Sequence, residues 1–242
     1  MDLVGGIAAG LAGLLPCFFF GGVAAIIISL VVWGIIRSRR RRDDLARLAA
    51  ELGFEFYADD PWDLPARYAG MDLFGIGHSH RASNVMAGRV DGRSVLAFDY
   101  QYTTGSGKNS HTYYFQATVF GTPIEAPRLS LRKENLLDTL ASWVGHDDLD
   151  FESEEFSKRY FVKCEDRKFA YDIFHARLIE YLLACGEAPA MEMTGPLLLL
   201  HDKQGGPEQV RRLLAIGGEI LRSIPDYVLH ERGIGDRAGG PA

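Results

Sequence analysis

The longest apolar stretch of the chain lies at its N-terminus. Residues Leu3–Ile36 contain no charged side chain. Backbone amides find no water inside a bilayer, so an apolar run of this length is typical of a membrane helix. Cys17–Ile36 alone spans about 30 Å at about 1.5 Å per residue, which matches the hydrocarbon thickness. The pattern predicts a transmembrane helix with a domain hung from it.

A block of basic residues ends the apolar stretch. It consists of Arg37, Arg39, Arg40, Arg41 and Arg42. Basic residues beside a span are retained on the cytoplasmic side, and the N-terminus offers only Asp2 to compete. Trp33 lies near the same end, where an indole ring is typical of the membrane interface. These residues predict contact with lipid headgroups and a single-pass protein of the cell (inner) membrane, with its N-terminus outside and its C-terminal domain in the cytoplasm.

The first part of the stretch, Leu3–Leu15, is too short to span a bilayer alone, and Pro16 interrupts the helical hydrogen bonds after it. It either extends the main helix or forms a re-entrant or interfacial arm. Small residues recur here at four-residue spacing: Gly5, Ala9 and Gly13, and separately Gly6 and Gly10. This spacing lets two helices approach closely, so the span is a candidate for homo-oligomer formation.

Beyond Arg42 the pattern alternates between helical and strand periods. Asp43–Leu52 reads as a short connector helix that Gly53 ends. Phe54–Tyr57 predicts a strand, and Gly70–Asn84 reads as irregular. From Val85 a three-stranded antiparallel meander follows, with a two-residue turn at Asp91–Gly92. Its two long strands are predicted at 94–103 and 111–120, with one apolar face and a core through Phe98, Tyr100, Phe115 and Val119.

The second half of the chain adds helices to this sheet. The predicted elements are a helix at Glu134–Val144, a strand at Tyr160–Lys163, a long helix at Arg167–Cys185, a hairpin of Met191–Met193 with Leu197–His201, and a helix at Pro207–Ile224. The fold class is therefore α+β, an N-terminal transmembrane helix followed by an antiparallel meander sheet packed with helices. We divide it into an anchor (1–42), a connector and meander subdomain (43–145), a helix–hairpin–helix subdomain (146–232) and a flexible tail (233–242).

Charge is distributed unevenly along the chain. Without Asp2 and the arginine block, 31 acidic and 21 basic side chains remain, a net charge of −10. An acidic body argues against nucleic acid as a partner, because phosphate contacts need a basic face. Cys164 and Cys185 are the only cysteines outside the apolar stretch, which fits a reducing compartment and excludes a disulfide framework.

Few residues of the chain are candidates for catalysis or metal binding. His78 and His80 could bind a transition metal if a third ligand such as His111 or Asp99 came near, but two histidines alone are weak candidates. Asp99, within an aromatic strand, could act as a general base if it faced a dry cleft. Gly105–Lys108 lacks the spacing and the following helix of a phosphate loop. No cofactor motif occurs.

Several segments resemble an uncharacterised family of bacterial membrane-anchored proteins. They are the arginine block, GFEFYADDPWDLP (53–65), RASNVMAG (81–88), AFDYQYTTGSGK (97–108), and FESEEF (151–156) with FAYDIFH (169–175). The resemblance implies one or two N-terminal spans and a cytoplasmic α+β domain of unknown function. It brings no catalytic residue or cofactor.

The hypothesis that these patterns favour is a membrane-anchored binding or scaffold module, whose partners are the lipid bilayer and another protein. Two alternatives stay open. A small-ligand sensor or regulatory domain would need a pocket lined by Tyr100, Tyr102 and Tyr113 beside Asp99. A hydrolytic or metal-dependent enzyme would need His78, His80, Asp99 or His111 to converge.

Overall fold

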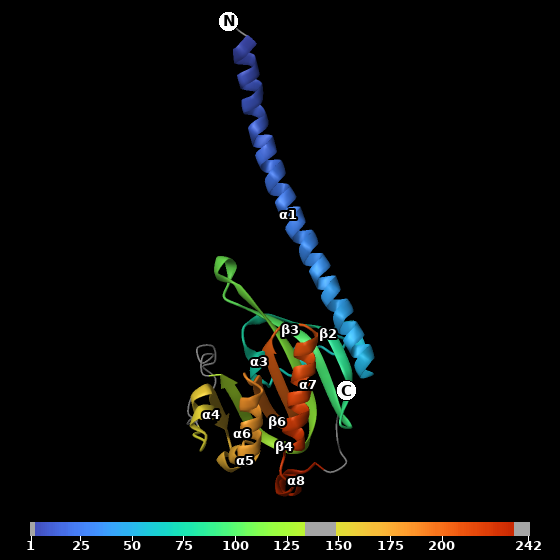
Figure 1. Ribbon diagram of the computed structural model, residues 1–242, viewed down its shortest axis with the longest axis vertical. Coiled ribbons are helices and arrows are strands. Elements are labelled where there is room, and N and C mark those ends of the chain that lie inside the picture. Colours follow the sequence, from blue (N-terminus) through green and yellow to red (C-terminus); the bar gives the residue numbers. More distant parts are fainter. Residues whose placement is uncertain (1–2, 134–148, 235–242) are drawn as a thin grey trace. The chain divides into compact units, whose positions relative to one another are not determined.

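The computed structural model describes residues 3–133 and 149–234, with side chains from residue 25 onward. Its helices are α1 (Leu3–Leu52), α2 (Leu64–Arg67), α3 (Asp72–Gly75), η1 (Gly107–Asn109), α4 (Glu154–Arg159), α5 (Arg167–Ile173), α6 (Ala176–Ala184), α7 (Pro207–Arg222) and α8 (Asp226–Arg232) (Figure 1). Its strands are β1 (Glu55–Asp59), β2 (His78–Val90), β3 (Arg93–Thr104), β4 (His111–Lys133), β5 (Tyr160–Cys164) and β6 (Ala190–Lys203). The predicted helix Glu134–Val144 lies outside the described residues.

The chain divides into two compact units, Met1–Asp44 and Leu45–Ala242. In the first unit, α1 continues through the arginine block without a break. Within the described part of the chain, no helix carries an apolar stretch long enough to cross a membrane. The predicted span Cys17–Ile36 begins before residue 25, so the side chains of its first part lie outside the description, as do those of the small residues at four-residue spacing.

The second unit is an α+β domain built on one antiparallel sheet, as predicted. Strands β1 to β4 follow one another as a meander. The first half of β4 pairs with β3, its second half pairs with β5 on the same edge, and β6 runs along the other edge. Asp91 and Gly92 both have positive φ (51° and 77°), as the predicted two-residue hairpin turn requires. One sheet therefore takes strands from both predicted subdomains.

Both faces of this sheet are buried, whereas the sequence predicted one apolar face. Alternate residues of β3 point to opposite faces. Leu96 and Phe98 pack under the α2–α3 segment, which precedes the sheet in sequence. Val95 and Ala97 belong to a larger core on the other face, to which α7 and the last turns of α1 contribute. Figure 1 shows α7 lying across this face.

Close contact between α7 and the sheet depends on glycine. A Cβ built on Gly217 would lie 2.2 Å from the ring of Phe120 on β4. The absence of a side chain at this position therefore lets the helix backbone rest on an aromatic ring. The predicted helix Pro207–Ile224 is confirmed apart from its last two residues.

Three predicted elements are corrected. The hairpin expected around Thr194–Gly195 is one continuous strand, β6, because its irregularity is a shift in pairing with β4 and not a reversal of the chain. The helix expected at Arg167–Cys185 is two helices. Phe174 leaves the helical region (ψ 52°), and the His175 side chain accepts a hydrogen bond from Leu178 N, starting α6. The segment Gly70–Asn84, expected to be irregular, contains α3 and the start of β2.

The segment from Gly233, predicted to be a flexible tail, is attached to the sheet at its start. Gly233 forms a β-bridge with Ile124, and the amide of Ile234 donates to the carbonyl of Pro123 at 3.0 Å. The first two residues of the segment are therefore bound to β4. Residues 235–242 lie outside the described structure.

Candidate functional site

The described side chains of α1 before the arginine block are apolar on every side of the helix. The large hydrophobic residues between Ile26 and Ile36 are 45–62% exposed. Successive residues are about 100° apart around a helix, so residues 26–28 and 30–33 already surround it. A helix that is apolar all round is typical of a buried or membrane-spanning segment, not of one in water.

Trp33 and Arg37 form a pair at the end of this apolar surface. The guanidinium carbon of Arg37 lies 5.4 Å from the centre of the Trp33 ring, at the four-residue spacing that brings side chains together on a helix. A cation over an indole face contributes about 0.5–1 kcal/mol at an exposed site. Trp33 and Arg37, two of the residues predicted to contact lipid headgroups, therefore contact each other in the structure.

The tyrosines proposed as a pocket lining form a continuous row on one face of the sheet, with Phe115 beside them. We call Tyr100, Tyr102, Tyr113 and Phe115 the aromatic strip. The ring of Tyr102 stacks on Tyr113 and on Phe115, with centres 5.4 Å apart in both pairs. The residues come from β3 and β4, where Tyr102 pairs with Tyr113 and Tyr100 with Phe115. The three candidates for a pocket lining therefore lie side by side on the sheet.

Most of the strip is closed to solvent. Tyr100 and Tyr102 are 1% and 5% exposed, and burial raises the pKa of both phenols. The Tyr100 hydroxyl lies 3.4 Å from the carbonyl oxygen of Leu73 and 2.7 Å from Nδ1 of His80. Tyr113 is 45% exposed and Phe115 is half-buried, whereas Tyr114, at 52%, lies on the opposite face of the strand. The outer end of the strip, at Tyr113, is therefore its most accessible part.

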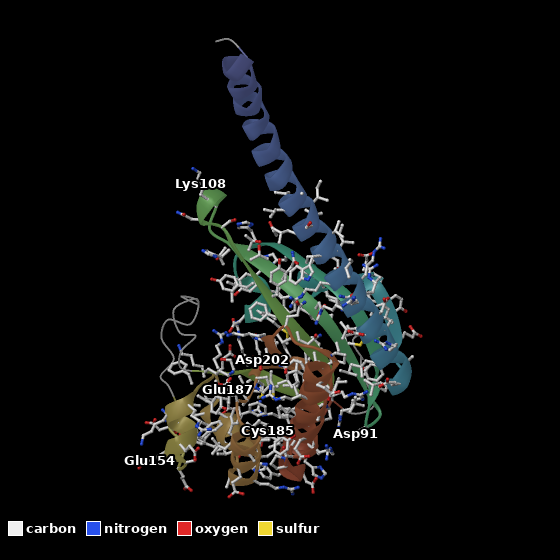
Figure 2. All side chains as sticks on the ribbon, turned by 45° about the horizontal axis from the view of Figure 1, so that its top comes forward. Asp91, Lys108, Glu154, Cys185, Glu187 and Asp202 are labelled. Atoms are coloured by element: carbon white, nitrogen blue, oxygen red, sulfur yellow. The ribbon has the colours of Figure 1, made fainter. Side chains whose placement is uncertain are left out.

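This outer end lies on the β3–β4 hairpin, whose tip carries Lys108 away from the body of the sheet (Figure 2). No acidic residue occurs between Tyr100 and Ile124. An uninterrupted acid-free stretch is unusual in a body with a net charge of −10. The exposed tyrosines therefore lie on a hairpin that carries no acidic side chain of its own.

Asp99 does not join the strip, because adjacent residues of a strand point to opposite faces. Its carboxylate is buried and accepts a hydrogen bond from Asn84 Nδ2 at 2.9 Å. Asn84 itself has a positive φ of 50°, at a shift in the pairing of β2 with β3. Asp99 therefore has the surroundings of a structural carboxylate that holds an irregular strand in place.

The histidines are separated by local backbone geometry. Ser79, between His78 and His80, has a φ of 57° where β2 shifts its register. Nε2 of His78 lies 2.9 Å from the carbonyl oxygen of Gly105, whereas His80 contacts Tyr100. Across the described residues, no group of three His, Cys, Asp or Glu side chains is placed to hold a metal ion, with His111 or otherwise.

A buried ionic cluster was missed by sequence reasoning. Asp72 at the start of α3 accepts from Arg128 and Arg132 of β4. Glu192 of β6 accepts from the Asp72 amide at 2.8 Å and lies 3.4 Å from Nε of Arg128. We call these four residues the ionic clamp, because they bind the α2–α3 segment to the sheet. Asp72 and Glu192 are 120 positions apart in the sequence, so no local pattern indicates that they meet.

The Glu192 carboxyl is unusual within the clamp. Burial raises its pKa to about 7, and the negative charge of Asp72 adds to the effect. The Asp72 amide and the two arginines act in the opposite direction. The clamp therefore contains a carboxyl whose pKa is shifted toward neutrality.

Comparison with known proteins gives one clear likeness. No protein-family model matches the chain, and no curated protein matches it. Its fold is similar to that of the mycobacterial trehalose monomycolate transport factor A, TtfA, with a TM-score of 0.55 and 16% sequence identity. The match covers 77% of this chain and 95% of the TtfA chain. At this identity the likeness establishes a shared fold.

Proposed function

We propose that this chain is a membrane-anchored binding module. A single span, Cys17–Ile36, holds it in the bacterial inner membrane with the N-terminus outside, and the cytoplasmic α+β domain binds another protein. The observation that carries the proposal is the all-round apolar, exposed surface of α1 up to Ile36, followed at once by five arginines. In water that surface would be unfavourable; in lipid it is favourable, and the arginines meet the headgroups.

The fold supports the binding part of the proposal. TtfA is named as a factor in trehalose monomycolate transport, and this chain shares its fold. By analogy, we assign this domain a partner-binding role in transport at a membrane. The residues considered for catalysis have separate partners: His78 contacts the Gly105 carbonyl, His80 contacts Tyr100, and Asp99 accepts from Asn84.

Two charges placed in the span test the anchor. The full chain carrying Ile27→Asp and Val31→Asp should leave the membrane fraction after alkaline extraction, because a charge within hydrocarbon costs about 2.5–3.5 kcal/mol per residue. Tyr227→Asp, at an exposed position of α8, is the control and should stay in the membrane. Release of the control, or retention of the double variant, would contradict the proposed anchor.

A C-terminal fusion tests the orientation. A fluorescent protein fused there should be bright and an alkaline phosphatase inactive, because the arginine block holds this end in the cytoplasm. The reverse result would overturn the topology.

Site-specific crosslinking tests the partner. A photoreactive residue at Tyr114 should give one discrete product with a protein of the same membrane, since exposed aromatic residues are favoured at interfaces. The same probe at Glu208, which is highly exposed on α7, is the control. Equal products from both positions would count against the hairpin as the binding surface.

A further inference from the structure

We propose that a cavity beside α5 and α6 binds a small organic cation with an apolar or aromatic body. The cavity has a volume of about 550 Å³ and lies between the segment 150–153 and these two helices. Sites for small molecules commonly have volumes of about 300–1,000 Å³. This site is independent of the proposed membrane anchor and of the aromatic strip.

The cavity exists because α5 and α6 are separate helices. Residues 167–185 have a continuous helical pattern, but the chain turns at Phe174 and His175, and both residues line the cavity. His175 is committed to this turn: its Nδ1 accepts from Leu178 N, and its Nε2 lies 2.9 Å from the Ser223 carbonyl oxygen. These two contacts hold the imidazole in the turn, so His175 shapes the wall of the cavity.

The inner part of the cavity is aromatic and aliphatic. The ring of Phe151 meets those of Tyr171 and Phe174 edge-on, with centres 5.2 and 5.7 Å apart. Phe174 and Ile179 are 2% and 6% exposed, whereas Tyr171 is 41% exposed at the opening. The Tyr171 hydroxyl donates to the carbonyl of Asp150 at 3.1 Å, which fixes the ring. An apolar ligand body would therefore meet preformed ring faces and edges.

The charged residues known to line the cavity are acidic. Asp150, Glu152 and Glu180 line it and are exposed, and no lysine or arginine is among the described residues of its lining. The start of α6 is also at the cavity and favours an anion, with the equivalent of about half a positive charge. Three carboxylates outweigh this half charge, so the net field favours a cation. The exposed ring of Tyr171 offers a face for the same cation.

A matched set of probes tests the charge preference. We would titrate 2-phenylethylamine, 2-phenylethanol and 3-phenylpropanoate, which share a phenyl body and carry a positive, no and a negative charge at pH 7. The sample is the full chain in zwitterionic nanodiscs, measured by calorimetry with empty nanodiscs as the blank. We expect saturable binding of the amine, at least fivefold weaker binding of the alcohol, and none of the acid. Equal binding of amine and alcohol, preference for the acid, or no saturable binding overturns the proposal.

Variants locate the binding. Glu152→Gln with Glu180→Gln should weaken amine binding about tenfold, because each exposed carboxylate contributes about a few-fold. Ala176→Phe fills the opening from an exposed position and should abolish binding. Glu208→Gln, on α7 and outside the cavity, is the control and should bind like the unaltered chain. Since these positions are on the surface, the variants should fold; amine binding that survives both cavity changes refutes this location.

Discussion

Protonation of Glu192 should control the stability of the domain near neutral pH. The side chain is 4% exposed, and burial, with Asp72 close by, raises its pKa from 4.5 to about 7. Below pH 4.5 the carboxyl is protonated in both the folded and the unfolded state. Between pH 4.5 and 7 the folded state retains a proton that the unfolded state has released. The free energy of unfolding contributed by this group is therefore fully present below pH 4.5 and is lost as the pH rises through 7.

The size of this effect follows from the difference in pKa. Each unit corresponds to about 1.4 kcal/mol, so a shift from 4.5 to about 7 amounts to about 3 kcal/mol. Glu192→Gln keeps the shape of the neutral carboxyl and cannot ionise. The variant should match the unaltered domain near pH 4.5 and should be more stable by about 2–3 kcal/mol at pH 8.

The difference in stability between the variant and the unaltered domain can be measured on a fragment that starts at Asp43. The fragment is unfolded with urea and followed by circular dichroism at several pH values between pH 4.5 and 8.5. Glu187→Gln is the control, because Glu187 is exposed and its ion pair with Lys133 lowers its pKa. Its stability should change little, and with the opposite dependence on pH. If Glu192→Gln is instead destabilising by about 3–5 kcal/mol at pH 8, the glutamate is an ionised partner of Arg128 and our reasoning on burial is wrong.

Three further predictions concern packing and the arginine block. Gly217→Ala should destabilise the fragment by about 1–3 kcal/mol, because its Cβ would lie 2.2 Å from an aromatic ring. Gly218→Ala is the control and should be neutral or stabilising by up to about 1 kcal/mol. Equal urea midpoints for the two variants would contradict the close contact at Gly217. Phe98→Ala should cost about 3–5 kcal/mol and Phe115→Ala less, because only Phe98 is fully buried; equal losses of melting temperature would contradict this. A fragment that includes the arginine block should bind anionic vesicles at low salt and release them as salt rises, whereas a fragment without it should not; sedimentation that ignores salt would show a different lipid-binding surface.

The meander was predictable because its signals are local. Alternating residues in β3 and the Asp91–Gly92 turn specify strands and register over neighbouring positions. The burial of the second face was not predictable in this way. Gln116 and Thr118 are fully buried, although polar residues in alternation read as a solvent face. Gln116 lies at the centre of the sheet and donates from Nε2 to the Phe98 carbonyl, a partner that only the folded sheet supplies.

The break between α5 and α6 shows a different limit. No glycine or proline interrupts Phe169–Cys185, so periodicity alone predicts one helix. His175 nevertheless begins a new helix by capping Leu178, a role more often taken by Ser, Thr, Asp or Asn. The cavity depends on this turn, and hence it could not be predicted from the pattern. Alternation along the strands placed Tyr100 and Tyr102 on one face of the sheet, but the burial of Tyr100 depends on its contacts with Leu73 and Phe74 of the distant α2–α3 segment.

The fold restricts where a partner can bind without unfolding the domain. The α2–α3 segment packs on Tyr100, the inner end of the aromatic strip, and the ionic clamp holds this segment to β4 and β6. Two features of the described domain are open to solvent: the acid-free hairpin with Tyr113 and Tyr114, and the acid-lined cavity beside α5 and α6. Their local charges differ, so one ligand cannot suit both equally well. A protein or lipid surface that meets the hairpin and a cation that enters the cavity would therefore bind as separate events, and saturating the cavity with the amine probe should leave crosslinking at Tyr114 unchanged.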